Sequence, residues 1–454
     1  HIMSEDEWKW ETLDKSIIQN TNELAEECNA KLKAAPMISY DTGSTILQKC
    51  KIGARRLKID LTNPEYKERL EYEIEIIEKR GFQDYFFIVA DLLMEAKQYC
   101  LVGPGRGSSG GSLVCYLMGI TEIDPIEYKL IFERFVDLNR VGLPDVDTDI
   151  PDAYRQRVIK YLISKYGTDN VRSIGIISTL KPRSAISNVA KILNIPIDIV
   201  ESVKESVVER QGGDDRADSC ISDTFSGTEI GRDVIEKYPK LLLSEKIENH
   251  AHHAGKHAAG VIVSNEPLYN YAGIDSREST IMLTGQEAES QGLLKIDVLG
   301  LRTLSVLQET AKLGGFNYKD FYKIPLDDKK VFQIFNDDRV YGIFQFEGSS
   351  TRNLVRRVTI ENFEDICAAT ALSRPGALIS RQTDKYVRRK NGEDEPVYFG
   401  KIHKEITEST YGSVVYQEQG MELMRRYGGM TWSDINILRK AISKSYGDAF
   451  FAKY

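Results

Sequence analysis

The sequence predicts an α+β protein, and three features of its pattern support that fold class. Apolar residues recur at helical spacing over 63–99. Short apolar runs of strand length follow at 174–179, 261–264 and 293–298. From residue 303 onward the pattern is again mostly helical. Strands confined to the middle of the chain indicate one central α+β unit that carries two largely helical attachments.

The first part of the chain contains the following expected helices. Two helical stretches cover 12–33 and 63–99. The glycine-rich run 102–112 ends the second stretch, because glycine is unfavourable inside helices. A further helix is expected to start from this run and to cover 113–120, and another covers 153–166.

The middle of the chain combines strands and helices. We expect a short strand at 174–179, followed by a mostly helical stretch over 183–254. A polar segment at 211–228 is expected to be a loop within that stretch. The apolar runs 261–264 and 293–298 are expected to be strands of one sheet, shared with an aspartate-bearing strand.

Composition limits the class of protein. The chain has 454 residues, 41% hydrophobic and 28% charged, which is ordinary for a soluble protein of roughly two to four domains. No apolar run approaches the roughly 20 residues that span a bilayer, and no signal peptide is evident. The six cysteines form no CxxC pair, which favours a reducing cytoplasmic compartment over a disulfide framework. The net charge of −8 does not favour generic nucleic-acid binding, although a local basic groove would suffice.

The segment Pro144–Asp149 is the most informative in the chain. Alternate residues of an extended strand face the same way, so Asp145 and Asp147, and also Asp149, present carboxylates on one face. Neighbouring carboxylates repel each other unless a cation lies between them. Oxygen ligands of this kind suit Mg²⁺, which often also binds substrate phosphates. The segment therefore predicts a metal site for phosphoryl or nucleotidyl transfer.

The run Gly105–Gly110 formally matches GxGxxG. No strand precedes it and no Lys-Ser/Thr pair ends it, so neither a dinucleotide fingerprint nor a P-loop is indicated. Its position before a helix start favours anions, because backbone N–H groups and the helix dipole point there. Arg106, Ser108 and Ser109 add donors. A phosphate-binding loop is the preferred interpretation, and a flexible turn is the alternative.

The segment 294–301 places a charged pair in an apolar strand. Lys295 and Asp297 are two positions apart and face the same way. A structural ion pair at the sheet edge is one interpretation. The other is that Asp297 joins Asp145 and Asp147 in a site for two metal ions, with Lys295 neutralising charge on a transferred phosphate.

Four of the six histidines fall within 249–260. Zinc binding is a weak interpretation, because no cysteine or ordered ligand pattern accompanies them. A glycine- and alanine-flanked loop in which Lys256 and His257 approach a nucleic-acid backbone is preferred.

Basic residues gather late in the chain. Three clusters together are more consistent with a phosphate-contacting surface than a single cluster, although charge runs are usually solvated faces. These residues are Arg352, Arg356, Arg357, Arg374, Arg381, Lys385, Arg388, Arg389, Lys390, Arg425, Arg426, Arg439, Lys440 and Lys444.

Eight motifs in order resemble those of bacterial family C replicative DNA polymerases, the DNA polymerase III alpha subunits. The resemblance runs from about residue 15 to the end of the chain. The motifs are Gly103–Ser108, Pro144–Asp147, Gly255–Ala258, Lys295–Leu301, Ile324–Asp328, Gly342–Glu347, Ser373–Gly376 and Val415–Gln419.

This resemblance implies a polymerase-beta-like nucleotidyltransferase palm with an inserted helical thumb and mainly helical fingers. Residues 1–14 would be a tag remnant and N-terminal extension. The palm would comprise 15–176 and 253–302, the thumb 177–252, and the fingers, expected to be incomplete, 303–454. The implied activity is template-directed addition of dNTPs to a primer 3′ end in DNA replication.

The resemblance also assigns roles to individual positions. Asp145, Asp147 and Asp297 would hold two Mg²⁺ ions, with Lys295 as a further catalytic residue. The residues implied to bind the nucleotide are Arg106, Gly107, Ser108, Arg134, Arg374, Arg439, Lys440 and Lys444. The residues implied to bind DNA are Lys256, His257, Arg352, Arg356, Arg388 and Arg389.

Primer–template DNA and dNTPs are the implied partners. Other replisome subunits, such as a sliding clamp and a proofreading exonuclease, would bind through regions that this chain lacks, and no membrane partner is implied. The location would be the cytoplasm of a bacterium or of a phage-infected host.

Several positions depart from the family pattern. Ser109 and Gly111 differ within the glycine run, Thr148 is polar where an apolar residue is usual, and Ala377 replaces a usual proline. A divergent phage-encoded member and a catalytic core cut from a longer protein both fit these departures. Two alternative functions stay open, namely a nucleotidyltransferase without a template and a non-catalytic protein that binds DNA or partner subunits.

Overall fold

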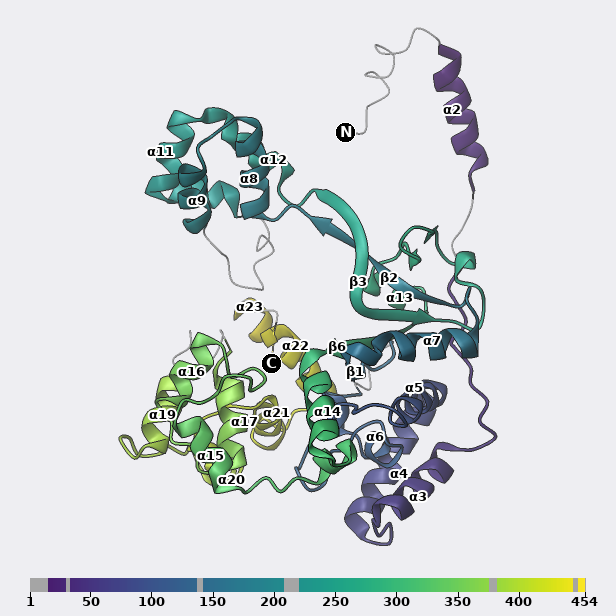
Figure 1. Cartoon of the computed structure of the whole chain (residues 1–454), viewed down its shortest axis with the longest axis vertical. Coiled ribbons are helices and arrows are strands. Elements are labelled where there is room, and N and C mark those ends of the chain that lie inside the picture. The colour runs from purple at the N-terminus through teal and green to yellow at the C-terminus, as the bar shows by residue number, and fades with distance from the viewer. Residues whose placement is uncertain are drawn as a thin grey trace.

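The computed structural model describes residues 15–29, 33–136, 142–207, 220–374, 382–443 and 448–453. This part of the chain contains many helices and a single mixed sheet of six strands (Figure 1). The predicted α+β class is therefore confirmed. None of the described helices is long and apolar enough to cross a membrane.

The sheet has the strand order β1-β6-β3-β2-β5-β4. The pairs β1–β6 and β2–β5 are parallel, and the other neighbours are antiparallel. The strands are β1 Asp147–Pro151, β2 Val171–Thr179, β3 Ala251–Val263, β4 Ile274–Asp275, β5 Thr280–Ile281 and β6 Leu294–Leu301. The three predicted apolar strands are all present. The loop predicted over 249–260 was wrong, because β3 begins at Ala251 and pairs with β2 along most of its length.

A helical layer packs on one face of the sheet and forms the largest core. Phe86, Leu113 and Phe132 are fully buried there together with alternate residues of β1, β3 and β6. The helix predicted over 63–99 is two helices, because Gly81 adopts a positive φ of 68° and ends the first. The helices before β2 are α2 Lys15–Glu27, α3 Ile46–Leu57, α4 Pro64–Lys79, α5 Gln83–Ala96, α6 Leu113–Leu117 and α7 Arg155–Tyr166.

Helix α3 was not predicted. It begins at a capping box in which Thr45 and Gln48 bond each other's backbone N–H groups, and it buries Ile46 and Cys50. Helix α7 packs across β2, β3 and β6 and so joins this layer to the sheet.

A small helical unit is inserted between β2 and β3. These two strands extend from the sheet as a ribbon that leads to the inserted helices (Figure 1). Its buried residues form a core of their own between Ala185 and Leu241. The helices are α8 Pro182–Ile192, α9 Ile197–Glu205, α10 Ile221–Gly227, α11 Glu229–Lys237 and α12 Leu243–Ile247. The loop predicted over 211–228 was wrong for α10, and its residues 211–219 lie outside the described chain.

The chain after β6 is mostly helical, as predicted. A separate core contains Phe332, Phe346, Leu354 and Tyr386. The helices of this part are α14 Arg302–Gly314, α15 Lys329–Asn336, α16 Ser349–Val355, α17 Phe363–Leu372, α19 Gln382–Lys390, α20 Lys401–Thr407, α21 Gln417–Arg426, α22 Trp432–Ser443 and α23 Asp448–Phe451. The short helix α13 Gly285–Ser290 precedes β6.

Candidate active site

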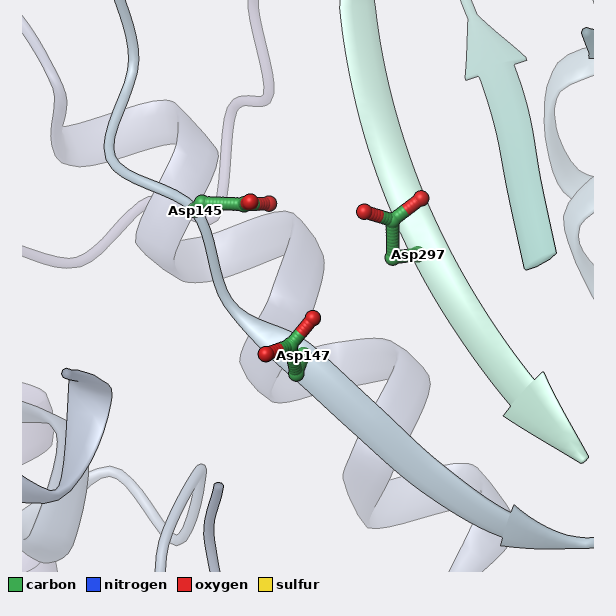
Figure 2. A group of neighbouring side chains, drawn as sticks. All are labelled: Asp145, Asp147 and Asp297. Atoms are coloured by element: carbon green, nitrogen blue, oxygen red, sulfur yellow. The ribbon is translucent and has the colours of Figure 1, made fainter. Parts of the chain in front are cut away.

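Strand register brings the predicted acidic residues together. β1 and β6 are parallel, and Asp147 lies directly opposite Asp297. The Thr148 hydroxyl donates to the backbone carbonyl of Asp297 at 2.7 Å and so fixes this register. Asp145 precedes β1, and one carboxylate oxygen from each aspartate lies within 4.8 Å of the others. Figure 2 shows the three carboxylates around one shared space.

The alternation of side chains explains why these acids emerge on the same face. Ile150 of β1 and Ile296 and Val298 of β6 point into the helical core. Asp147 is three positions before Ile150, and Asp297 lies between Ile296 and Val298, so both aspartates point to the opposite face. Packing of the apolar residues of β1 and β6 in the core therefore also fixes the direction in which the two carboxylates point.

The electrostatics of this group favour a bound cation. Burial raises the pKa of Asp147, and the carboxylate of Asp145 raises it further. Asp297 is only 9% exposed, and its Oδ1 is buried without a hydrogen-bond partner among the residues that the structure describes. A buried carboxylate oxygen without a donor is costly, and a divalent ion would satisfy it. The three aspartates supply the hard oxygen ligands that Mg²⁺ prefers.

Lys295 lies on the same face as Asp297. Its Nζ is 3.1 Å from Oδ2 of Asp297 and 3.6 Å from Oε1 of Glu289. Burial alone would lower the pKa of Lys295, but the carboxylates of Asp145, Asp297 and Glu289 raise it overall. Lys295 is therefore a protonated cation beside the acidic group.

The glycine run lies against the aspartate strand. The Gly103 N–H donates to the carbonyl of Asp149 at 2.8 Å. Gly107 has a φ of 70°, and a Cβ at this position would be 3.1 Å from Oδ2 of Asp147. The positive φ favours glycine at 107, and a side chain there would crowd the carboxylate of a metal-ligand candidate. Arg106 lies beside it, with Nη1 3.6 Å from Oδ1 of Asp149.

The expectation that the helix start after the glycine run offers free N–H groups to an anion was wrong. Helix α6 has only five residues, and the carboxylate of Glu73 already accepts from the N–H groups of Leu113 and Val114. The chain thus supplies its own anion at this point. A phosphate group would have to bind the earlier part of the run, around Arg106 to Ser108.

Comparison with known proteins agrees with this geometry. Residues 44–300 match the family model described as the bacterial DNA polymerase III alpha NTPase domain, and 302–451 match the bacterial DNA polymerase III alpha subunit finger domain. The chain is similar to the DNA polymerase III subunit alpha of Staphylococcus aureus strain Mu50, with 35% identity over 457 residues. It is equally similar, at 35% over 460 residues, to that of Staphylococcus epidermidis strain ATCC 12228.

The chain belongs to the bacterial DNA polymerase III alpha family. Each of these alignments covers 98% of the chain and 42% of the relative. The chain therefore spans less than half the length of the curated relatives it matches. All three aspartates and the glycine run lie within the part that matches the NTPase-domain model of the family.

Two residues that the family resemblance assigned to DNA lie on β3. Lys256 is exposed. His257 is half-buried, and its Nδ1 accepts from the backbone N–H groups of Ala259 and Gly260 at 3.2 and 2.8 Å. The imidazole therefore turns back onto its own strand, and only its other nitrogen is available to a partner.

The family's implied nucleotide-binding residues divide into separate groups. Gly107 and the half-buried Ser108 lie in the glycine run. Arg134 instead joins the segment before β1 to α21, because its Nη1 is 2.6 Å from Oε1 of Glu418 and its Nε donates to the side chain of Gln417.

The remaining members of that group come from the C-terminal helices. Arg374 is exposed just after α17. Arg439 is half-buried and Lys440 is exposed on α22. Lys444 lies outside the described residues.

The predicted DNA-binding arginines of this family member have intramolecular partners. Arg352 and Arg356 both bind Asp338, at 2.7 and 2.6 Å. Arg388 pairs with Asp394 at 2.8 Å, and Arg389 donates to the backbone carbonyl of Tyr411. Part of the basic charge read from the sequence is thus compensated within the C-terminal region itself.

Sequence reasoning missed Arg69 and Glu73 of α4. The only available signal was their spacing of four residues, which is typical of an exposed helical ion pair. Glu73 is in fact fully buried beneath the glycine run.

Proposed function

We propose that this chain is the catalytic core of a template-directed DNA polymerase, which adds dNTPs to a primer 3′ end by two-metal nucleotidyl transfer. The observation that carries the proposal is the direct pairing of Asp147 with Asp297 beside Asp145. Membership of the DNA polymerase III alpha family and the adjacent glycine run support the same activity.

The acidic group fits a divalent cation. Asp145, Asp147 and Asp297 would hold Mg²⁺, which would give Oδ1 of Asp297 the partner that it lacks in the described part of the chain. Two bound Mg²⁺ ions would lower the pKa of the attacking hydroxyl and stabilise charge on the leaving group.

The chain's own cations would act around the triphosphate. Lys295 would stabilise negative charge on the transferred phosphate, because its ammonium group lies on the same face as Asp297. Arg106 is bound to Asp149 only loosely at 3.6 Å, so it would be able to turn to the triphosphate. The open backbone around Gly107 and Ser108 would let N–H groups approach the phosphates closely.

The domain roles belong to the same proposal. The sheet with its helical layer would be a polymerase-beta-like palm, over 15–176 and 253–302. The inserted helices within 177–252 would be the thumb, and 303–454 the fingers. The separate cores of the insertion and of the C-terminal helices support this division.

The implied partners and location also remain proposals. Primer–template DNA would bind across these units, with Lys256 and the arginines of the C-terminal region contacting its phosphates. Replisome subunits would be further partners, and the cytoplasm would be the location.

Primer extension by the purified chain tests the proposal. With Mg²⁺, dNTPs and a primed template of defined sequence, we expect products whose length and sequence follow the template. Asp297→Asn should abolish extension. Asp169→Asn is the matched control, because Asp169 is an exposed aspartate whose side chain pairs with Arg172.

Two results would contradict the proposal. Nucleotide addition that ignores the template would instead support the alternative of a nucleotidyltransferase that acts without a template. Normal extension by Asp297→Asn, with the control also normal, would remove the acidic group from the reaction.

A further inference from the structure

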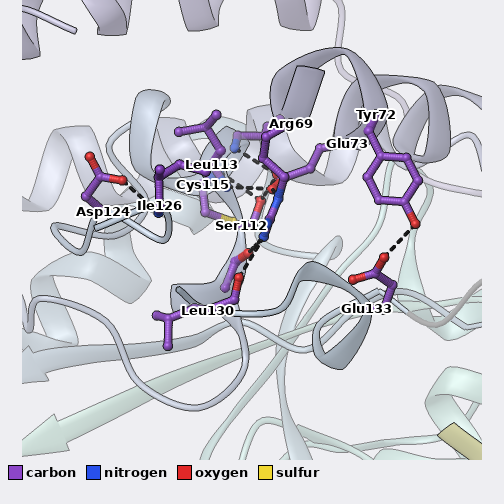
Figure 3. A network of polar contacts seen from close by, with 12 residues as sticks. Arg69, Tyr72, Glu73, Ser112, Leu113, Cys115, Asp124, Ile126, Leu130 and Glu133 are labelled. Atoms are coloured by element: carbon purple, nitrogen blue, oxygen red, sulfur yellow. Dashed lines mark hydrogen bonds and ion pairs between the residues drawn. The ribbon is translucent and has the colours of Figure 1, made fainter. Parts of the chain in front are cut away.

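The glycine run ends on a buried carboxylate. Glu73 of α4 is fully buried. Its Oε2 accepts from the Ser112 hydroxyl at 2.7 Å and from the Val114 N–H at 3.0 Å. Its Oε1 accepts from the Leu113 N–H at 2.9 Å and from Arg69 Nε at 2.7 Å. Figure 3 shows this network.

All four partners of Glu73 donate to it. Three of them, Arg69 and the N–H groups of Leu113 and Val114, can only donate, whereas the Ser112 hydroxyl can also accept. Burial raises the pKa of Glu73, while the Arg69 guanidinium and the hydrogen bonds from Leu113, Val114 and Ser112 act in the opposite direction. These donors therefore favour the carboxylate form against the effect of burial.

Arg69 holds the next residues of the run through backbone carbonyls. Its Nη2 donates to Gly111 at 2.6 Å and to Leu130 at 3.0 Å. A Cβ at position 111 would be 2.6 Å from the carbonyl oxygen of Ile131, so the two segments are in close contact. One guanidinium thus joins the glycine run to the segment before Arg134 and to Glu73.

The opposite end of the run is bound to β1 by the Gly103 N–H and the Asp149 carbonyl. Gly107 lies between these two attachments, against Asp147. We propose that the Arg69–Glu73 pair positions the glycine run for dNTP binding, by holding its far end at a fixed distance from the aspartates. This inference rests on the proposed function. Neither residue touches the nucleotide, so both are positioning residues.

A purely structural role is the alternative, since removal of any buried ion pair lowers stability. The two roles differ in what they predict for substrate binding. A positioning role changes the affinity for dNTP with little effect on DNA, because only the run is displaced. A structural role lowers thermal stability and leaves the KM for dNTP unchanged in the folded fraction.

Glu73→Gln is the decisive variant. Each carboxylate oxygen accepts from at least one backbone N–H, so either orientation of the amide turns its NH₂ group toward a group that can only donate. We expect the KM for dNTP to rise about tenfold, with the Kd for primer–template within about twofold of wild type. The KM comes from steady-state extension and the Kd from fluorescence anisotropy.

Asp91→Asn is the matched control. Like Glu73, Asp91 is a carboxylate that pairs with a basic side chain. Its partners are Tyr40, Tyr161 and Lys165, none of which belongs to the glycine run. It should lower the Tm without raising the KM for dNTP. An unchanged KM in folded Glu73→Gln would overturn the inference.

Arg69→Lys keeps the test valid if Glu73→Gln does not fold. A lysine retains the charge but cannot form the fork to Glu73, Gly111 and Leu130. The KM for dNTP should rise about threefold, and no rise would overturn the inference.

Direct binding of a fluorescent dATP analogue separates this inference from the proposed function. A wild-type chain that binds the analogue but extends no primer would refute the proposed polymerase function. The positioning role would then be tested by the affinity of Glu73→Gln for the analogue, which should be weaker than that of wild type. A wild-type chain that binds no analogue would overturn both.

Discussion

Replacing Asp147 by asparagine should stabilise the metal-free protein while it removes the activity. Three carboxylates are held together by the register of β1 and β6, and without a cation they repel one another. The raised pKa of Asp147, caused by burial and then by Asp145, has the same physical origin. An uncharged amide of the same size relieves this repulsion and weakens metal binding.

The size of the gain follows from the geometry. One oxygen of each carboxylate lies within 4.8 Å of the others. At an effective dielectric constant of ~20, two unit charges at that distance repel by about 3.5 kcal/mol. Asp145 is exposed and Lys295 compensates Asp297, so we expect a net gain of about 1–2 kcal/mol. This corresponds to a rise in Tm of about 2–8 °C for a domain of roughly 150–250 residues.

Thermal unfolding with EDTA and then with millimolar Mg²⁺ measures both effects. Wild type should gain stability on adding Mg²⁺, and Asp147→Asn should gain little. Primer extension by the variant should fall at least about a thousandfold, or about 4 kcal/mol of transition-state stabilisation. Asp169→Asn should match wild type in every assay. A variant that melts below wild type in EDTA, or that keeps the full Mg²⁺ response, would refute the reasoning.

Four further predictions concern charge. Lys295→Met should lower kcat about 10²-fold with little change in KM, because the cation beside Asp297 is lost; a kcat within twofold of wild type would exclude this role. Asp338→Asn should raise DNA affinity severalfold in anisotropy titrations by releasing Arg352 and Arg356, and an unchanged Kd would remove both arginines from the DNA surface. Hydrogen bonds from these arginines lower the pKa of Asp338 to about 2, so its ion pairs stabilise the fold above about pH 4 and are lost toward pH 2. The Tm of wild type should therefore exceed that of Asp338→Asn at pH 7, and the difference in Tm should close between about pH 4 and pH 2. Primer–template affinity should fall at least about tenfold between low and physiological salt, and a salt-independent Kd would argue against phosphate contacts.

Local sequence patterns were sufficient for much of the fold. The three apolar strand runs and the helices after 303 follow from periodicity alone. Local patterns failed where longer-range contacts decided the conformation. The segment 249–260 resembles a loop by composition, but pairing with β2 makes it a strand.

The candidate site shows the same division. Alternation along an extended strand was enough to place Asp145 and Asp147 on one face. The sequence also indicated that Asp297 and Lys295 share a face. The two groups of residues come together only because β1 pairs in parallel with β6. All of the inserted helices lie between these two strands in the chain, so the pairing joins distant segments.

The sequence by itself determined which chemical groups are available, namely acids at alternate positions, a glycine run and basic clusters. Only the tertiary structure decided which of these groups already have intramolecular partners and which are available to a ligand. Arg352 and Arg356 are compensated by Asp338, and Glu73 takes the helix start that a phosphate was expected to bind. Spacing along the chain cannot reveal such partners, because burial and ion pairing depend on segments that the fold brings together from distant positions.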